Sequence, residues 1–301
     1  MYLKKIKKHI LRVLFGCLLA LLYIGGFCES PYTTNANLKF IAGDTLQEST
    51  HNFNPVVSPD GDRIYYLSVP KDEWSGGYEN QAGSIYSVNI DGSDATQILN
   101  GKFDNLAISP DGDRLAVQCF TPLDHYADPE SLIIVVEISN SSTESLWISL
   151  KEQLKKIVWS NSGDYLYFLT DNDIRRINVD NSIEEIVNTV GWIWGFDLFN
   201  NDSIHVNTAL WKPEIEPNDQ RYVLGSTDYF SRDLLIEDFE GDTMFALPES
   251  LTPYIYNWVA HPYWFPDGRA IVFAAAPIGG GAPGNDAAEI WLLENLFEQI
   301  E

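Results

Sequence analysis

Short apolar runs alternate with turn residues along most of the chain, and one such unit recurs. The segment SPDGDRIYYLS at 58–68 returns as SPDGDRLAVQC at 109–119, SNSGDYLYFLT at 160–170 and FPDGRAIVFAA at 265–275. The glycines Gly61, Gly112 and Gly163 recur at a spacing of 51 residues, and Gly268 follows about two periods later. A fixed period of this size indicates a repeat architecture.

Each copy predicts a strand, a tight turn and a second strand, because Asp-Gly between apolar runs favours a hairpin in which Gly takes a positive φ. The strand after the turn is continuously apolar, as at 64–67 and 271–273, so we expect neighbouring sheets to cover both of its faces. A second hairpin follows in each repeat, beginning near residues 84, 133, 174 and 234. Four antiparallel strands per repeat predict an all-β fold built from propeller blades.

We count five first hairpins and expect five four-stranded blades, with six blades as the alternative. The fourth unit carries FDLFNNDSIHVNT at 196–208 in place of a Pro-Asp-Gly turn, and its second hairpin turns at 240–242. The last unit ends after a third strand at 289–293, while a lone apolar strand at 38–42 precedes the first unit. We expect these two strands to pair and close the ring, since closure removes exposed sheet edges.

The motif S-P-D-G-x-x followed by four apolar residues resembles the WD40-like repeat of the TolB-type propellers, also found in the propeller domain of prolyl-oligopeptidase-like proteins. The resemblance covers nearly everything after residue 37, and it implies a fold more than a function. TolB-like propellers usually have six blades, which is the alternative to our count. Because the segment before residue 37 is short, we expect no room here for the amino-terminal domain that accompanies TolB propellers.

A basic segment precedes an uncharged, mainly apolar run at 13–28. This pattern predicts a signal peptide or a membrane or lipid anchor at 1–30, followed by a single propeller domain at 31–301. The run is shorter than the ~20 residues that span a bilayer, so a cleaved or lipidated end is favoured over a permanent anchor. Cys28 lies where a bacterial lipoprotein carries its lipidated cysteine, although Phe27 stands where a small residue is expected. We expect an extracytoplasmic protein: periplasmic, membrane-anchored or secreted.

The chain is strongly acidic, with 43 Asp and Glu against 19 Lys and Arg and a formal net charge of −24. Such a surface repels phosphate backbones and anionic lipid. We therefore expect no nucleic-acid partner, and membrane contact only through the N-terminal segment. Solubility outside the cell is the simplest explanation of the acidity.

Motifs of catalysis and of cofactor binding are missing from the sequence. It contains no G-x-S-x-G nucleophile elbow and no H-E-x-x-H zinc motif, and the acids of the repeats are turn residues that do not match a calcium-binding loop. We expect no cofactor and assign no metal ligand or catalytic residue. His125, in a loop with Asp124 and Tyr126, is the one histidine that we consider for function.

The long connections all fall between strands two and three of a blade or between blades, and these emerge on one face of the ring. They are 70–83, 121–131, 211–232 and 277–287. Insertions gathered on one face of a repeat protein mark a binding face, and aromatic residues are enriched at recognition surfaces. The candidate partner-binding residues are Trp74, Tyr78, His125, Tyr126, Trp211 and Tyr222. The alternative is that these aromatics cap the channel and the blade ends.

The sequence thus favours a non-catalytic binding module for a protein or peptide partner at the cell envelope. The alternatives are a propeller lyase or hydrolase acting on an extracellular polysaccharide, and a purely structural scaffold. Clustered ionisable side chains at the channel mouth would favour the enzyme, whereas a wide aromatic-rimmed patch would favour binding.

Overall fold

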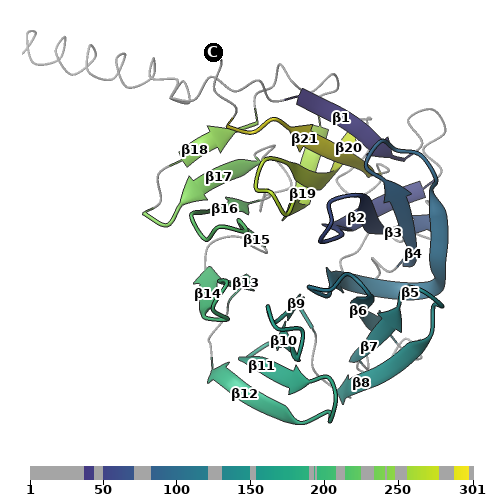
Figure 1. The fold of residues 1–301 in the computed structure, drawn as a ribbon, viewed down its shortest axis with the longest axis vertical. Helices are drawn as coiled ribbons and strands as arrows, with labels where there is room; N and C mark the ends of the chain where they lie inside the picture. The colour runs from purple at the N-terminus through teal and green to yellow at the C-terminus, as the bar shows by residue number, and fades with distance from the viewer. Residues whose placement is uncertain are drawn as a thin grey trace, which may run out of the picture.

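A computed structural model gives the structure of the chain and describes residues 37–43, 50–70, 83–120, 131–149, 154–189, 193, 195–207, 214–224, 234–240, 243–247, 256–277 and 288–297. The regular elements in these ranges are all β-strands, and none of the described segments is a helix of the length and apolarity needed to cross a membrane. The strands form antiparallel sheets arranged around a ring (Figure 1). The fold is therefore a β-propeller, as the repeat predicts.

The described strands divide into six units, which we number as blades along the chain. Blade 1 contains β2 (Thr50–Val57), β3 (Arg63–Pro70), β4 (Gly83–Asn89) and the first half of β5 (Thr96–Ile108). Blade 2 contains the second half of β5, β6 (Arg114–Phe120), β7 (Ser131–Glu137) and β8 (Thr143–Ser149). Blade 3 contains β9 (Lys156–Trp159), β10 (Tyr165–Leu169), β11 (Asp173–Asn178) and β12 (Glu184–Thr189).

The second half of the ring is less regular. Among the described residues, blade 4 contains β13 (Gly195–Leu198) and β14 (Ile204–Asn207) and no further strand. Blade 5 contains β15 (Glu214–Ile215), β16 (Arg221–Leu224), β17 (Leu235–Asp238) and β18 (Thr243–Ala246). Blade 6 contains β19 (Tyr256–Trp264), β20 (Ile271–Pro277), β21 (Glu289–Glu294) and β1 (Asn37–Ala42).

Strand pairing at two places helps to hold the ring together. The 13-residue strand β5 pairs with β4 near its start and with β6 near its end, so blades 1 and 2 share one seven-stranded sheet. Strand β1 pairs antiparallel with β21, with Leu38 opposite Leu293, and so supplies the outer strand of blade 6. The expected closure of the ring by the N-terminal strand is confirmed.

The count of five blades needs correction, because the described strands form six units. The fourth repeat of the sequence joins two of them: its first hairpin is β13–β14, and its second hairpin, β17–β18, belongs to the next sheet. The first hairpin of that next sheet is β15–β16, within the segment that the sequence suggested was a long loop at 211–232. Blade 5 went unrecognised because its turn, EPNDQR at 216–221, has Asp219 where four of the repeats have Gly.

Five of the six first hairpins nevertheless use the same turn, and the turn of β13–β14 is one residue shorter, since Phe199 donates to Ser203. In all six, the residue that begins the turn donates its N–H across the hairpin and accepts an N–H from the third residue after it, as Ser58 does with Arg63 and Gly61. That third residue has a positive φ, between 68° and 79° at four glycines and 59° and 58° at Asp202 and Asp219. Asp tolerates this left-handed conformation better than most residues, which explains how both positions keep the turn without Gly.

The core lies between neighbouring blades. The second strands are buried on both faces, as the continuous apolar runs predict: Ile64 and Leu67 of β3 and Val272 and Phe273 of β20 have no exposed surface. One cluster of buried residues joins blades 1, 2 and 6, and further clusters join blades 2 and 3, blades 3 and 4, and blades 5 and 6. Each sheet is thus held by the apolar faces of its neighbours.

Candidate functional site

A cavity of about 320 Å³ occupies the centre of the ring at the end where the first-hairpin turns lie. The inner strands β2, β5, β9, β13, β15 and β19 all contribute to its lining. The turn residues Pro59, Pro110, Asn161, Asn200, Pro217 and Pro266 form its rim. Because all six blades contribute, the cavity is the mouth of the propeller channel.

Two positions on each inner strand set the chemistry of the channel. We number them by counting back from the first residue of the first-hairpin turn, such as Ser58 in blade 1. The position four residues before it holds Asn54, Asn105, Lys156, Gly195 and His261 in the described blades. The position two residues before it holds Val56, Ala107, Val158, Asp197, Glu214 and Tyr263. Charged residues therefore gather on blades 3, 4 and 5, while the facing strands present amides and apolar side chains.

A buried lysine lies between two carboxylates at this point. Lys156 Nζ is 2.8 Å from Glu214 Oε1 and 3.9 Å from Asp197 Oδ1. Lys156 is 5% exposed and Asp197 is 6% exposed. The second oxygen of Asp197 accepts the backbone N–H of Ile215 at 2.6 Å. The cluster thus links the inner strands of three successive blades, β9, β13 and β15.

Burial dominates the protonation chemistry of these groups. It raises the pKa of the Asp197 carboxyl, while the Lys156 ammonium and the N–H of Ile215 act in the opposite direction. Burial also raises the pKa of the Tyr263 hydroxyl, to which Glu214 and Asp197 add. The same cause lowers the pKa of His205, which lies on β14 behind Asp197. The cavity therefore contains the Asp197 carboxyl with a raised pKa and the protonated Tyr263 hydroxyl, beside the Lys156 ammonium that pairs with Asp197 and Glu214.

The opposite side of the channel carries an amide network. Asn54 and Asn105 both have a φ of 48° and lie at register shifts of their strands. Asn54 Nδ2 donates to Asp104 Oδ1 at 3.0 Å, and Asn105 Nδ2 donates to Gln118 Oε1 at 2.7 Å. A bulge of this kind re-aims side chains, here into the channel. His261 occupies the same position in blade 6, with a φ of 51° and a register shift beside it.

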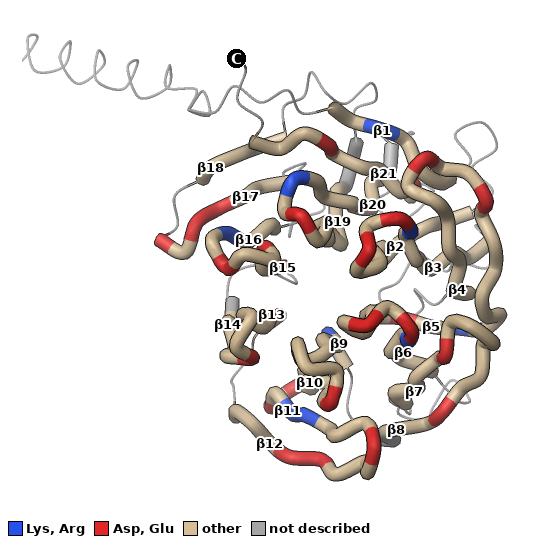
Figure 2. The backbone as a smooth tube through the Cα atoms, viewed as in Figure 1, with Lys and Arg blue, Asp and Glu red and all other residues tan. Residues whose placement is uncertain are grey.

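Carboxylates surround the mouth on the turns themselves. The acids on these turns are Asp60, Asp62, Asp111, Asp113, Asp164, Asp202, Glu216, Asp219 and Asp267, against Arg63, Arg114, Arg221 and Arg269. Figure 2 shows the acidic turns as red segments around the centre of the ring. Three of the four arginines already pair with carboxylates: Arg63 with Asp94, Arg114 with Asp111, and Arg221 with the buried Glu216. The face that carries the turns is therefore acidic.

Two of these turn acids, Asp60 and Asp111, have a pKa below the ordinary value. The Ser58 hydroxyl and the N–H of Asp62 donate to Asp60 and lower the pKa of its carboxyl. Ser109 does the same for Asp111, with contributions from the N–H of Asp113 and from Arg114. Hydrogen bonds to the charged form stabilise it.

Neighbouring turns contact one another along the rim. A Cβ at Gly112 would lie 3.1 Å from the Cδ atom of Pro59. In blades 3 to 5 an Asn–Asp pair replaces this Pro–Gly pair: Asp202 Oδ1 accepts both the N–H and Nδ2 of Asn161 at 2.9 Å, and Asp219 Oδ1 and Oδ2 accept the N–H of Asn200 at 3.1 Å. The two aspartates thus shape their own turns and also tie them to the preceding blade.

Most residues predicted from the sequence lie outside the described part of the chain. This applies to Trp74, Tyr78, His125, Tyr126 and Trp211, and to Cys28 at the N-terminal segment. Their roles stay predictions.

Tyr222 is described, and its assignment to a long loop was wrong. It lies on β16, is 8% exposed, and donates its hydroxyl to Glu237 Oε2 at 2.9 Å. Its ring packs against His205 and Phe239, with centroids 5.5 and 5.4 Å apart. It lies between blades 4 and 5 because β16 pairs with β15 to form the first hairpin of blade 5, which the sequence did not reveal.

Solved structures match this architecture at low sequence identity. TolB from Acinetobacter baumannii matches with a TM-score of 0.40 and 16% identity, over 83% of this chain and 55% of TolB. An oligogalacturonate lyase from Vibrio parahaemolyticus matches with a TM-score of 0.47 and 12% identity, over 80% of this chain and 77% of the lyase. A chain of a nidogen–laminin complex matches with a TM-score of 0.50 and 14% identity, over 68% of this chain and 82% of that chain.

The resemblance is one of fold. This chain spans about half the length of the TolB structure, and identities of this size carry no information on activity. No protein-family model matches the sequence, and no curated protein matches it. The propeller resemblance read from the repeat is confirmed at the level of the fold, and function has to be argued from the site.

The channel cluster was not predicted, although the sequence holds a signal for it. Asp197 in FDLF and Glu214 in PEIE stand at inner-strand positions where the regular repeats have Val56 and Ala107. A charge in a register that is otherwise apolar marks a functional or structural cluster. Aligning the two irregular repeats on Asp202 and Asp219 would have revealed both residues. Among the described residues, no three His, Cys, Asp or Glu side chains converge to hold a metal ion.

Proposed function

We propose that this chain is an exported, non-catalytic binding module that recognises a positively charged segment of a protein partner at the cell envelope. The observation that carries the binding role is the channel-mouth cavity, encircled by the acidic turns of the blades (Figure 2). A ring of one sign of charge around a recess focuses its field on the mouth and attracts ligands of the opposite sign. A Lys- or Arg-rich peptide segment fits this chemistry.

The state of Lys156 supports binding over catalysis. Its ammonium is compensated by Asp197 and Glu214, which come from the two following blades. The three residues form a polar floor that also ties the truncated blade 4 into the ring. A ligand that carries its own cations can be accommodated without breaking this cluster.

Export rests on the N-terminal sequence. The basic segment and apolar run at 1–30 support a cleaved signal or an anchor, lipidated at Cys28 in the second case, ahead of a propeller domain at 31–301. Partner contacts on the opposite, long-loop face remain part of the proposal. Replacing Trp74, Tyr126 and Trp211 with Ala one at a time separates the two roles of these aromatics. A recognition residue weakens partner binding at unchanged melting temperature, whereas a structural cap lowers the melting temperature.

The channel-mouth site is tested by removing charge without disturbing the turns. Asp62, Asp113 and Asp164 are exposed turn acids, and the turn hydrogen bonds run through their neighbours Asp60, Asp111 and Ser162. We expect the triple Asp→Asn variant to bind a short lysine-rich peptide about tenfold more weakly at low salt, as measured by fluorescence anisotropy. The difference should shrink toward physiological salt, where the Debye length is about 8 Å.

The control makes the same change in net charge away from the mouth. Neutralising Glu137, Glu144 and Asp180, on the β7–β8 and β11–β12 hairpins, should weaken the peptide less than threefold. If both triple variants lose the same affinity for the peptide, the effect comes from the overall net charge, and a site at the channel mouth is refuted.

The enzyme alternative retains one specific observation, the perturbed Asp197 carboxyl beside Lys156 and Tyr263 in the cavity. A carboxyl group with a raised pKa is suited to proton transfer near neutral pH. As a lyase or hydrolase, the protein would turn over a soluble extracellular polysaccharide and lose that activity in Asp197→Asn. Turnover by the wild-type protein would replace the non-catalytic proposal.

A further inference from the structure

In the described part of the chain, blade 4 has no strands in the outer half that the other blades have. Strands β13 and β14 form a two-stranded sheet, whereas each of the other five units has four strands in the described residues. Six residues, 208–213, join β14 to β15. Six residues reach about 20 Å when fully extended, which is the length of one strand and too short for two strands with their turns. We call the place of the missing third and fourth strands the outer position of blade 4.

The backbone of β14 presents an edge toward this position. Phe199 donates its N–H to Ser203, and Asp197 lies opposite His205 in the β13–β14 ladder. Bonding alternates along an antiparallel ladder, so the N–H and C=O groups of Ile204 and Val206 point away from β13. Their equivalents in blade 1, Ile64 and Tyr66, lie opposite Val88 and Tyr86 of β4. No described strand takes the corresponding place beside β14.

Blade 3 lies on one side of the outer position, and strand pairing shows which residues of β11 and β12 face blade 4. Ile174 of β11 belongs to the same buried cluster as Phe196 and Leu198 of β13, so its side of the sheet faces blade 4. By alternation Arg176 is on that side, and so is its partner Glu185, 2.7 Å away. Ile183, two residues before Glu185, is 59% exposed.

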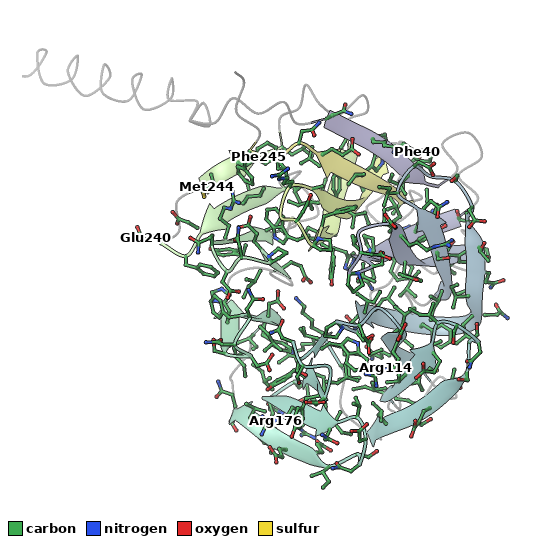
Figure 3. The ribbon with its side chains drawn as sticks, viewed as in Figure 1. Phe40, Arg114, Arg176, Glu240, Met244 and Phe245 are labelled. Carbon is green, nitrogen blue, oxygen red and sulfur yellow. The ribbon has the colours of Figure 1, made fainter. Side chains whose placement is uncertain are left out.

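Blade 5 bounds the outer position on the other side. Tyr222 and Glu237 face blade 4, since the Tyr222 ring contacts His205 of β14. Phe239 follows β17, is 38% exposed, and contacts His205 and Phe199 with centroids 5.3 and 5.0 Å apart. Figure 1 shows β14 between β12 and β17 with no described strand drawn outside it, and in Figure 3 the labelled Arg176 and Glu240 stand on the two sides.

The charges of the two sides indicate what would fit between them. The Arg176–Glu185 pair leaves the blade 3 side balanced. The described part of the β17–β18 hairpin carries Glu237 on the side of blade 4 and Glu240 just after Phe239, and it has no Lys or Arg. An occupant therefore needs basic side chains toward blade 5, and apolar side chains for Ile183 and Phe239. A second copy of this acidic chain meets these demands poorly.

We propose that the outer position of blade 4 is a docking site for an extended segment of a partner protein, which pairs with β14 as the missing third strand. Main-chain bonds to Ile204 and Val206 provide the affinity, and alternating apolar and basic side chains provide the selectivity. The site is separate from the channel mouth, and the proposal does not depend on a ligand there.

The test uses a proline that removes only the outward donor. Val206→Pro deletes an N–H that points away from β13, so the β13–β14 ladder keeps its bonds, as for proline on an edge strand. The probe is a short fluorescent peptide of alternating lysine and valine, titrated into the full chain. We expect Val206→Pro to weaken binding about tenfold, and Val206→Ala, which keeps the N–H, to weaken it less than threefold.

Side-chain contacts are tested with a pair of phenylalanines of similar exposure. Phe239→Ser should weaken the peptide about fivefold, whereas Phe40→Ser, on β1 of blade 6 with 36% exposure, should leave binding unchanged. If Val206→Pro melts well below the wild type, the same peptide with alternate amides N-methylated is titrated into the wild-type chain. It should fail to bind.

Three results would overturn the proposal. The first is that Val206→Pro binds the peptide as tightly as the wild-type chain does, or that the wild-type chain binds the N-methylated peptide as tightly as the unmodified one. The second is loss of the peptide only in the triple Asn variant of the channel mouth, which would place it there. The third is a dimer of the wild-type chain that Val206→Pro dissociates, which would make a second copy the occupant.

Discussion

Replacing Lys156 with Met removes the counterion of two channel carboxylates and leaves the volume of the side chain nearly unchanged. Asp197 and Glu214 then lose their cationic partner in a site where Asp197 is 6% exposed. Breaking a buried ion pair by removing one partner costs about 3 to 5 kcal/mol, because the remaining charge is uncompensated. We expect Lys156→Met to lose this amount of unfolding free energy at neutral pH, a large part of the stability of an ordinary domain.

The loss should depend on pH in a direction fixed by Asp197. Burial already raises the pKa of its carboxyl above the ordinary value of 3.8, and Lys156 opposes that rise, so the pKa rises further when the lysine is removed. A raised folded-state pKa means that the folded state binds more protons than the unfolded state between the two values. Stability is then lost as pH rises through the folded pKa and regained as pH falls. The deficit of Lys156→Met relative to the wild type should therefore shrink as pH falls from neutral toward the ordinary carboxyl pKa.

Urea denaturation followed by tryptophan fluorescence measures both quantities. Lys155→Met is the matched control, since the adjacent lysine pairs at 3.3 Å with the half-exposed Asp171 and should lose less than about 1 kcal/mol. Asp197→Asn added to Lys156→Met should restore part of the loss. A Lys156→Met deficit equal to that of Lys155→Met, or one that grows as pH falls, would refute the reasoning.

Three further predictions concern the turns and the core. Alanine at the turn glycines should lower the melting temperature most at Gly268, less at Gly112 and least at Gly61. A Cβ would lie 2.9 Å from the buried Glu216 at Gly268, would contact Pro59 at Gly112, and would contact nothing at Gly61, where the positive φ alone costs about 1 kcal/mol. Equal losses at the three positions would contradict these contacts. Asp202→Ala should lose about 1 to 2 kcal/mol through its two bonds to Asn161, and a change below 0.3 kcal/mol would show that the rim contact adds nothing. Burial raises the pKa of Tyr66 to about 12 from 10.0, so unfolding free energy should fall as pH rises from about 10 to about 12, by up to about 2.7 kcal/mol relative to Tyr66→Phe in denaturant titrations.

Local chemistry made the blade predictable. Serine, Asp and Gly at fixed offsets specify the hairpin turn, and the continuous apolar run after it requires cover on both faces, as β3 and β20 confirm. The lone strand at 38–42 could be assigned to ring closure because an apolar strand without a partner is unstable in water. These inferences use neighbours within one repeat or the general cost of an exposed edge.

The number of blades and the channel site depended on information that no single repeat contains. A turn keeps its shape with Asp219 in place of Gly, so the hairpin of blade 5 escapes a search based on glycine spacing. The truncation of blade 4 changes which segments pair, and pairing decides that Tyr222 is buried between blades.

The sequence by itself determined the repeating hairpin, the acidic surface and the closed all-β ring, because turn preference, charge and strand burial are properties of short segments. Only the tertiary structure brought Lys156, Asp197 and Glu214 together, from blades separated along the chain by irregular connections. Their meeting depends on the rotation of each blade about the channel axis. That rotation is set by the packing of whole sheets against one another, so the sequence can mark Asp197 and Glu214 as unusual inner-strand residues but does not show that they meet Lys156.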